Sequence, residues 1–133
     1  MVLYSVHINL LTIFMRIRKI LSMLKSLFMN FENISASACK KIIEEEGDNV
    51  MLVDVRSSAE YAQGMIDGSI NIPLDEITGR SNELSKEKKI ILYCASGNRS
   101  GMACRLLQAQ GFTELINMRG GIFAWKREGF DVK

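Results

Sequence analysis

Short apolar runs alternate with more polar, amphipathic segments from residue 32 to the end of the chain. Two of the runs are nearly continuous in Val, Ile and Leu, which is typical of strands buried on both faces of a parallel sheet. The predicted strands are 49–55, 69–72, 89–94 and, as an edge segment or a strand, 113–118. Because helix-forming segments separate these runs, the pattern predicts an α/β domain with a central, mostly parallel sheet flanked by helices.

Helix start and stop signals lie between these strands. Ser35 is a favoured N-cap residue, and Gly47 and Gly111 stop the helices that precede them. The predicted helices are 36–46, 57–63, 99–110 and 122–127, whereas residues 74–89 are polar and helix-permissive. The side chains expected to face the core from the third helix are Met102, Ala103, Leu106 and Leu107.

Residues 1–31 have a different pattern, which divides the chain into a 1–31 extension and a 32–133 domain. The apolar stretch 2–15 has 14 residues, fewer than the roughly 20 that cross a bilayer as a helix. From residue 13 onward, apolar positions recur at helical spacing opposite a basic face. The apolar positions are Ile13, Ile17, Ile20, Leu21, Leu24, Leu27 and Phe28, and the opposite positions are Arg18, Lys19, Ser22, Lys25 and Ser26.

This basic amphipathic helix predicts contact with an anionic membrane surface. One alternative is a helix that packs on its own domain or on a partner, and another is a poorly ordered extension. A signal peptide is disfavoured, because its basic residues would precede the apolar run and here they follow it.

Composition narrows the function classes. The 133 residues carry 17 basic and 15 acidic side chains, and this net charge of +2 is too small to indicate a nucleic-acid binder. The three cysteines form no CxxC pair, and His7 is the only histidine. The sequence therefore predicts no zinc site, no disulfide framework and no Cys–His dyad. Reduced thiols fit a cytoplasmic protein.

The candidate chemistry lies where the strand 89–94 ends in Cys94. Ligands of open α/β sheets bind at the carboxyl ends of the strands, and a loop of small residues follows here. Gly97 can take positive φ without steric cost, so the loop amides can form an anion-binding nest at the positive end of the next helix. Arg99 adds a fixed positive charge, and Ser100 can hydrogen-bond within the loop or to a ligand. Together these features favour a thiolate, so Cys94 is the candidate nucleophile.

A buried structural cysteine is the alternative interpretation of Cys94, but such a residue requires neither the small-residue loop nor Arg99. Cys39 and Cys104 fall inside predicted helices and are expected to be structural. For Cys104, ten residues beyond Cys94, a resolving thiol is the alternative.

The segment CASGNRS at 94–100 resembles the active-site loop of the rhodanese (thiosulfate sulfurtransferase) family, whose usual form is CxxGxRS. Other segments resemble the family's DVR…E-[FY], G-A-x-N-I-P and GF…GGxxxW patterns, in the family's order. They are Asp54-Val55-Arg56 with Glu60-Tyr61, Gly68 to Pro73, and Gly111-Phe112 with Gly120-Gly121-Ile122 and Trp125. The resemblance covers residues 32–133. Met65 departs from it, because the family often has histidine there, but that histidine is not the nucleophile and no loss of chemistry is expected.

The resemblance implies a rhodanese-like three-layer sandwich around a five-stranded sheet. It also implies a sulfurtransferase that moves sulfane sulfur from a donor such as thiosulfate to cyanide or a thiol through a Cys94 persulfide. The loop that would hold the persulfide comprises Ala95, Ser96, Gly97, Asn98, Arg99 and Ser100. No metal or organic cofactor is implied. The expected partners are small-molecule donors and acceptors or a protein thiol or persulfide, with no nucleic acid, and a monomer is expected.

Supporting roles are expected for residues at the end of the strand 49–55. Asp54 would hold the active-site loop through hydrogen bonds, and Arg56 would pair with Glu60. Trp125 is expected to pack rather than to contact substrate. The pair Gly120-Gly121 is expected to form a tight turn, since a dinucleotide site would need GxGxxG after a strand.

Three other functions are weighed against this one. Related phosphatases and arsenate reductases use a similar Cys-loop-Arg geometry, but the phosphatase loop is one residue longer than the four residues that separate Cys94 from Arg99. The shorter loop suits a single sulfur anion. Non-catalytic binding modules of this family commonly lack the cysteine, which is present here. A persulfide carrier that serves tRNA thiolation or cofactor sulfuration would use the same chemistry, and the sequence does not separate it from a free-standing enzyme.

Overall fold

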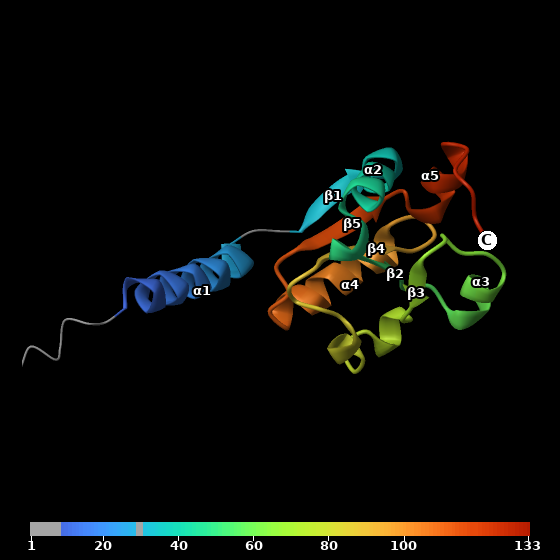
Figure 1. The fold of residues 1–133 in the computed structure, drawn as a ribbon. Coiled ribbons are helices and arrows are strands. Elements are labelled where there is room, and N and C mark those ends of the chain that lie inside the picture. The colour runs from blue at the N-terminus through green and yellow to red at the C-terminus, as the bar shows by residue number, and fades with distance from the viewer. Residues whose placement is uncertain (1–8, 29–30) are drawn as a thin grey trace, which may run out of the picture. The chain divides into compact units, whose positions relative to one another are not determined.

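The computed structural model describes residues 9–28 and 31–133 (Figure 1). The chain divides into two units, 1–30 and 31–133. The larger unit has a sheet of five strands, all parallel, in the order β1-β5-β4-β2-β3. The strands are β1 (Glu32–Ser35), β2 (Val50–Asp54), β3 (Ser69–Asn71), β4 (Lys89–Tyr93) and β5 (Leu115–Arg119). The predicted α/β fold with a central five-stranded sheet is confirmed.

Helices cover both faces of this sheet (Figure 1). They are α2 (Ala36–Glu46), α3 (Ser58–Ala62), α4 (Asn98–Ala109) and α5 (Gly121–Arg127), and the short 3₁₀ helices are η1 (Gly47–Asn49), η2 (Leu74–Glu76) and η3 (Ser81–Glu83). Two serines start helices as N-caps. The Ser35 hydroxyl accepts from the amide of Ala38, and Ser57 forms a capping box with Glu60. The helix predicted from residue 57 therefore begins at Ser58.

Alternate side chains of the central strands β2, β4 and β5 enter different cores, because successive residues of a strand point to opposite faces of the sheet. From β4, Ile90 and Leu92 join the cluster that holds Cys94, whereas Ile91 and Tyr93 join the other cluster. The first cluster includes Ala103, Cys104 and Leu107 of α4, and the second includes Ala36 and Cys39 of α2 and Ile122 and Trp125 of α5. The sheet thus separates the helix that follows Cys94 from the pair α2 and α5.

The hydrophobic pattern did not predict the strand β1. Its sequence, ENIS, has one apolar residue, because β1 lies at the edge of the sheet and pairs only with β5. The segment predicted as 113–118 is a strand over 115–119, and it lies inside the sheet between β1 and β4. A polar edge strand gives no run of buried residues for a sequence pattern to detect.

The predicted inward face of α4 was partly wrong. The buried residues of the helix are Ser100, Ala103, Cys104 and Leu107, at the spacing of one helical face. Met102 and Leu106 are 49% and 37% exposed instead. The smaller residues Ser100 and Cys104 lie on the buried face, where larger apolar residues were expected. Met102 and Leu106 therefore lie outside that face.

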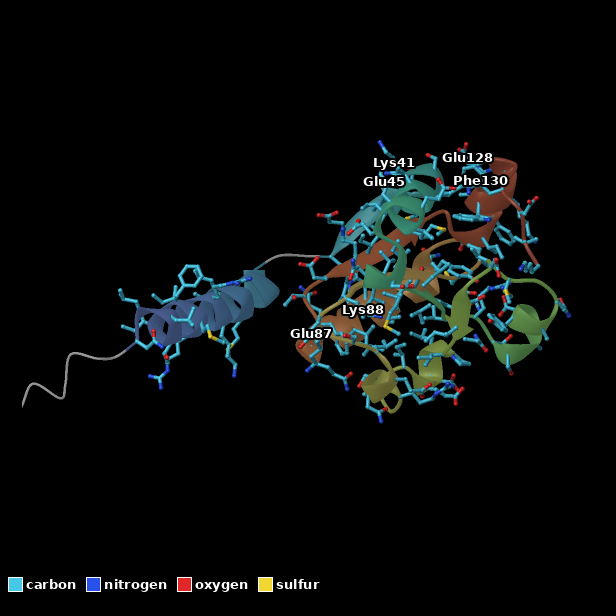
Figure 2. The ribbon with its side chains drawn as sticks, in the orientation of Figure 1. Lys41, Glu45, Glu87, Lys88, Glu128 and Phe130 are labelled. Atoms are coloured by element: carbon cyan, nitrogen blue, oxygen red, sulfur yellow. The ribbon has the colours of Figure 1, made fainter. Side chains whose placement is uncertain are left out.

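Trp125 packs within the domain, as predicted. Its ring meets Phe130 edge-on with centroids 5.0 Å apart, and its Nε1 donates to the carbonyl of Asp131 at 2.9 Å. The outer face of α2 is charged, with Lys41 and Glu45 one turn apart at 3.9 Å (Figure 2). The contacts of Trp125 with Phe130 and Asp131 fasten the C-terminal segment to the second core.

The helix α1 (Leu10–Phe28) lies in the smaller unit and begins three residues earlier than the predicted helical pattern. Within its own unit, its apolar side chains stay exposed, with Ile17 48%, Leu21 58% and Leu24 44% exposed. Among residues 9–28 and 31–133, no helix is long and apolar enough to cross a membrane. The first part of the predicted apolar stretch, with His7, lies outside the described residues.

The start of α5 packs tightly against the loop after β4. The amide of Ile122 donates to the carbonyl of Cys94 at 2.9 Å, and the amide of Phe123 donates to the carbonyl of Ala95 at 3.2 Å. Gly121 has φ +58°, and a Cβ there would overlap both carbonyl groups. Only glycine allows this approach, so the pair Gly120-Gly121 makes the predicted tight turn and also shapes the loop.

We expect Gly121→Ala to lower the free energy of unfolding by more than about 2 kcal/mol, measured by urea denaturation. The left-handed backbone costs an L-residue roughly 1–2 kcal/mol, and the methyl group must also displace the loop. Gly129→Ala is the matched control, because Gly129 has φ +80° but open space around its Cβ. Equal losses in the two variants would contradict a tight contact between α5 and the loop.

Candidate active site

Cys94 directly follows β4, which has β2 on one side and β5 on the other. Its side chain is 1% exposed. The chain then turns at Gly97, whose φ of +109° is left-handed, and α4 begins at Asn98. The helix therefore directs its first backbone amides, and the positive end of its dipole, toward the loop that surrounds the sulfur.

Hydrogen bonds from this loop converge on the Cys94 sulfur. The amide of Gly97 lies 3.0 Å from Sγ, and the Ser100 hydroxyl lies 3.4 Å from it. Burial acts to raise the pKa of the Cys94 thiol, but the hydrogen bonds of the Ser100 hydroxyl and of the amides of Ser100, Gly97 and Ser96 act to lower it. The hydrogen bonds outweigh burial, so the pKa of Cys94 lies below its ordinary value.

The other two thiols lie in different surroundings. Cys39 and Cys104 are fully buried, and burial raises the pKa of each to about 12. Both are therefore protonated at neutral pH, in keeping with the structural roles expected for them. The alternative role of Cys104 as a resolving thiol requires a thiolate, and its raised pKa argues against that role.

Arg99 lies beside the loop and pairs with Glu60 of α3. Its two terminal nitrogens donate to the two carboxylate oxygens of Glu60 at 2.6 and 2.9 Å. These hydrogen bonds lower the pKa of Glu60 to about 2. The predicted pairing of Arg56 with Glu60 is wrong, because the Glu60 carboxylate is taken by an arginine 39 residues away in sequence. The loop arginine is thus held at a fixed place by a neighbouring helix.

Arg56 pairs instead with Asp54. The Asp54 carboxylate is fully buried, and the guanidinium donates to both of its oxygens. A terminal nitrogen of Arg56 lies 2.7 Å from Oδ2 of Asp54, and it also donates to the carbonyl of Gly64 at 2.6 Å. The backbone amide of Arg56 donates to the same carboxylate at 2.9 Å. The pair therefore fastens the segment after β2. The Asp54 carboxylate binds Arg56, not the loop after Cys94 to which sequence reasoning assigned it.

Asn117 of β5 is a polar residue of the site that sequence reasoning missed. Its Nδ2 donates to the carbonyl of Gly97 at 3.1 Å, and its Oδ1 lies 2.5 Å from the Ser100 hydroxyl. Its Nδ2 also donates to Oδ1 of Asn33 on β1 at 2.9 Å. An asparagine within the apolar strand sequence LINM was the available signal, since a buried amide needs partners.

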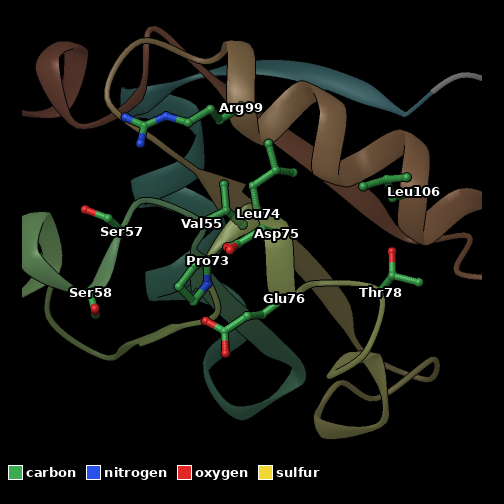
Figure 3. A pocket seen from close by; sticks show the side chains of 10 residues that line it. All are labelled: Val55, Ser57, Ser58, Pro73, Leu74, Asp75, Glu76, Thr78, Arg99 and Leu106. Carbon is green, nitrogen blue, oxygen red and sulfur yellow. The ribbon is translucent and has the colours of Figure 1, made fainter.

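An open cleft of about 690 Å³ lies beside Arg99 on the side of α4, and neither Cys94 nor residues 95–98 line it (Figure 3). Arg99 and Leu106 of α4 form one wall, and the segments that follow β2 and β3 form the others (Figure 3). Val55 lines the cleft and packs in the same cluster as Cys94. The other lining residues are Ser57, Ser58, Pro73, Leu74, Asp75, Glu76 and Thr78. In the described part of the chain, no group of three His, Cys, Asp or Glu residues is placed to hold a metal ion.

Comparison with known proteins shows which family this chain matches. Residues 35–128 match the rhodanese-like domain. The chain is 41% identical over 98 residues to a sulfurtransferase of Allochromatium vinosum, which covers 74% of this chain and 90% of the relative. It is 31% identical over 115 residues to the thiosulfate:glutathione sulfurtransferase of Saccharomyces cerevisiae, covering 77% and 83%. A rhodanese-related crystal structure from Thermoplasma volcanium is 33% identical with a TM-score of 0.70, covering 77% and 98%.

We expect iodoacetamide at pH 7 to modify Cys94 of the folded protein at least about tenfold faster than Cys39 or Cys104, because alkylation requires the thiolate. Peptide mass spectrometry after timed quenching would measure the three rates. The rate at Cys94 should fall as the pH drops through its pKa. In Cys94→Ser, labelling of the folded chain should be slow and should become fast in urea. Equal rates at all three thiols of the folded protein would contradict an activated Cys94.

Proposed function

The chain belongs to the rhodanese-like domain family, and from that premise we propose that it transfers sulfane sulfur through a persulfide on Cys94. The relatives compared above are named as sulfurtransferases, and the chain shares a sulfurtransferase-type function with them. The specific donor, acceptor and covalent intermediate are the proposal. The observation that carries it is the Cys94 sulfur itself, which is buried and hydrogen-bonded, with the only lowered pKa of the three thiols.

In the first half of the reaction, the Cys94 thiolate attacks the outer sulfur of thiosulfate. A new S–S bond forms at Sγ, the S–S bond of thiosulfate breaks, and sulfite leaves with the electron pair of that bond. The negative charge of the nucleophile moves to the outer sulfur of the persulfide. Loop amides that already point toward the sulfur would stabilise this charge without reorganisation, in the manner of an oxyanion hole.

In the second half, a thiophilic acceptor attacks the outer sulfur of the persulfide. Cyanide would form thiocyanate and a thiol would form its own persulfide, and in both cases the Sγ–S bond breaks and Cys94 leaves as a thiolate. A leaving thiol of lowered pKa departs faster. The loop that activates the nucleophile therefore also assists its release.

The cleft beside Arg99 is the proposed route for the donor and the acceptor, because it lies next to the end of the loop that follows Cys94. Thiosulfate would fill a small part of its 690 Å³, which leaves room for a larger thiol. The name of the yeast relative includes glutathione as an acceptor, and a low-molecular-weight thiol is therefore proposed as an acceptor here. A protein thiol or persulfide partner is the alternative. The proposed chemistry uses the chain's own side chains and amides and needs no metal or organic cofactor.

The loop length supports sulfur transfer over phosphate-ester hydrolysis. Four residues separate Cys94 from Arg99, one fewer than in the related phosphatases, and the Arg99 guanidinium is paired with Glu60. A tetrahedral phosphate would need a wider ring of amides and a free guanidinium. The narrow loop instead surrounds one sulfur atom.

We expect reduced protein incubated with thiosulfate to gain the mass of one sulfur, and cyanide to remove it as thiocyanate. Intact-protein mass spectrometry and a colorimetric thiocyanate assay would measure both halves. Cys94→Ser should abolish the gain, since the nucleophile is lost. Cys104→Ser, the matched control, should load normally. Loading that persists in Cys94→Ser would overturn the proposal, and the absence of loading in the wild type would exclude thiosulfate as donor.

We also infer that α1 holds the protein on an anionic membrane surface. The support is the open apolar face of α1, together with four basic residues and no acidic residue in residues 1–31. Basic side chains near an anionic surface contribute about 1 kcal/mol each, and the apolar face would enter the headgroup boundary.

Sedimentation with vesicles that contain phosphatidylserine would test this inference. Leu21→Asn should reduce binding several-fold because it removes an apolar side chain from the contact face. Met15→Asn, on the opposite side of the helix, should have a much smaller effect. Binding should weaken with salt and in vesicles of phosphatidylcholine alone. Equal binding by the two variants, or none by the wild type, would contradict a membrane-facing α1.

A further inference from the structure

A single hydrogen atom lies between two acceptors beside the nucleophile. The Ser100 hydroxyl oxygen is 2.5 Å from Oδ1 of Asn117 and 3.4 Å from Sγ of Cys94. A hydroxyl has one hydrogen and can therefore donate to only one of these two atoms at a time. Ser100 and Cys94 are fully buried and Asn117 is 6% exposed, so the acceptor that is not chosen has little access to water.

The orientation of the Asn117 amide is fixed by its other partners. The carbonyl of Gly97 can only accept, so the atom of Asn117 that faces it at 3.1 Å is the nitrogen. The second hydrogen of this nitrogen goes to Oδ1 of Asn33 at 2.9 Å. The amide oxygen must then face Ser100, and it can only accept. At 2.5 Å, two oxygens without a hydrogen between them would repel each other, so the Ser100 hydroxyl donates to Asn117 in this geometry.

We propose that Asn117 competes with the Cys94 sulfur for the Ser100 hydroxyl hydrogen and thereby limits how strongly Ser100 stabilises the thiolate. When Cys94 is a thiol, its S–H can donate to Ser100, which donates in turn to Asn117. When Cys94 ionises, either Ser100 turns to the sulfur and leaves the buried Asn117 oxygen unpaired, or a lone pair of Ser100 faces the thiolate. Both outcomes disfavour the charged sulfur.

The competition matches the sulfur-transfer cycle, and this part of the inference rests on the proposed function. In the persulfide the charge lies on the outer sulfur, and Sγ is a neutral, weak acceptor. The Ser100 hydrogen then returns to Asn117 with no loss. Asn117 thus favours the loaded form over the free thiolate. It also keeps the thiolate reactive, since nucleophilicity falls as thiol pKa falls.

The charged groups around the loop are the same in all the variants proposed below. They are Arg99 with Glu60 from α3, the buried Asp54–Arg56 pair after β2, and Arg119 at the end of β5. A change in the titration of Cys94 between these variants therefore reports the hydrogen-bond network rather than a changed charge.

A double-mutant cycle tests the proposal without requiring sulfur transfer. The four proteins are wild type, Asn117→Leu, Ser100→Ala and the double variant, and the pH dependence of iodoacetamide labelling gives the Cys94 pKa of each. Loss of Asn117 also removes its bond to Gly97, and the Ser100→Ala background measures that effect alone. Relative to this background, Asn117→Leu should raise the thiolate-to-thiol ratio of the Ser100 protein about tenfold, the size expected for one hydrogen bond to a charge.

Each outcome of the cycle decides the proposal. An equal effect of Asn117→Leu in both backgrounds would show that Asn117 does not act through Ser100. An effect of opposite sign would show that Asn117 directs Ser100 toward the sulfur, and either result overturns the proposal. Circular dichroism would confirm folding, and Asn117→Val, which is β-branched and suits a strand, replaces Asn117→Leu if the latter unfolds. Asn33→Ala, the control, should leave the competition for the Ser100 hydrogen intact.

The link to sulfur transfer has its own measurement. Intact mass would give the thiosulfate-to-sulfite ratio at which half of the protein carries sulfur, above the pKa of Cys94. Asn117→Leu should require a higher ratio than wild type, because its thiolate is better stabilised. An unchanged ratio alongside a confirmed cycle would overturn the preference for the loaded form. A wild type that never loads would instead contradict the proposed function and leave the cycle result standing.

Discussion

The site depends on the balance of two opposing effects on the pKa of the Cys94 thiol: burial raises this pKa, and hydrogen bonds to the sulfur lower it. A strand buried on both faces carries Cys94 into surroundings that disfavour charge, as the raised pKa values of Cys39 and Cys104 show. The loop after β4 reverses this effect only at Cys94, because its backbone amides point toward the sulfur, while the Ser100 hydroxyl is shared between the sulfur and Asn117. A change that displaces the loop should therefore alter the pKa of Cys94 and, where it disturbs a packed contact such as that of Gly121, also the stability of the fold.

Neighbouring segments hold the loop in this shape from three sides. On one side α5 donates backbone amides to the carbonyls of Cys94 and Ala95, and Gly121 permits the contact. On another, Asn117 of β5 binds Gly97 and Ser100. On the third, Arg99 is fixed by Glu60, whose own position is set by the capping box of α3. The inward direction of the loop amides is thus a property of the whole carboxyl edge of the sheet.

The sequence predicts features that depend on residues close together in the chain, and it misses contacts between residues that lie far apart. The run KIILYC and the small residues after it predicted the strand and the loop around the candidate nucleophile, because burial and φ preference act within a few residues. It assigned Glu60 to Arg56, four residues away, whereas the true partner is 39 residues away. The edge strand β1 has no apolar run, and the local sequence around Asn117 does not show which partners its buried amide has. The position of β1 and the role of Asn117 follow only from the pairing of strands that lie far apart in the sequence.

The strand order has a consequence for how the protein matures. β1 is the first strand to be synthesised, yet it pairs only with β5, the last, and the bond between Asn33 and Asn117 spans 84 residues. Non-local pairings of this kind form late in folding, because loop-closure entropy must be overcome first. Until β5 and α5 have joined the sheet, the loop after Cys94 lacks the hydrogen bonds from Asn117, Ile122 and Phe123 that hold its shape. The surroundings that stabilise a Cys94 thiolate are therefore complete only when the whole domain has folded.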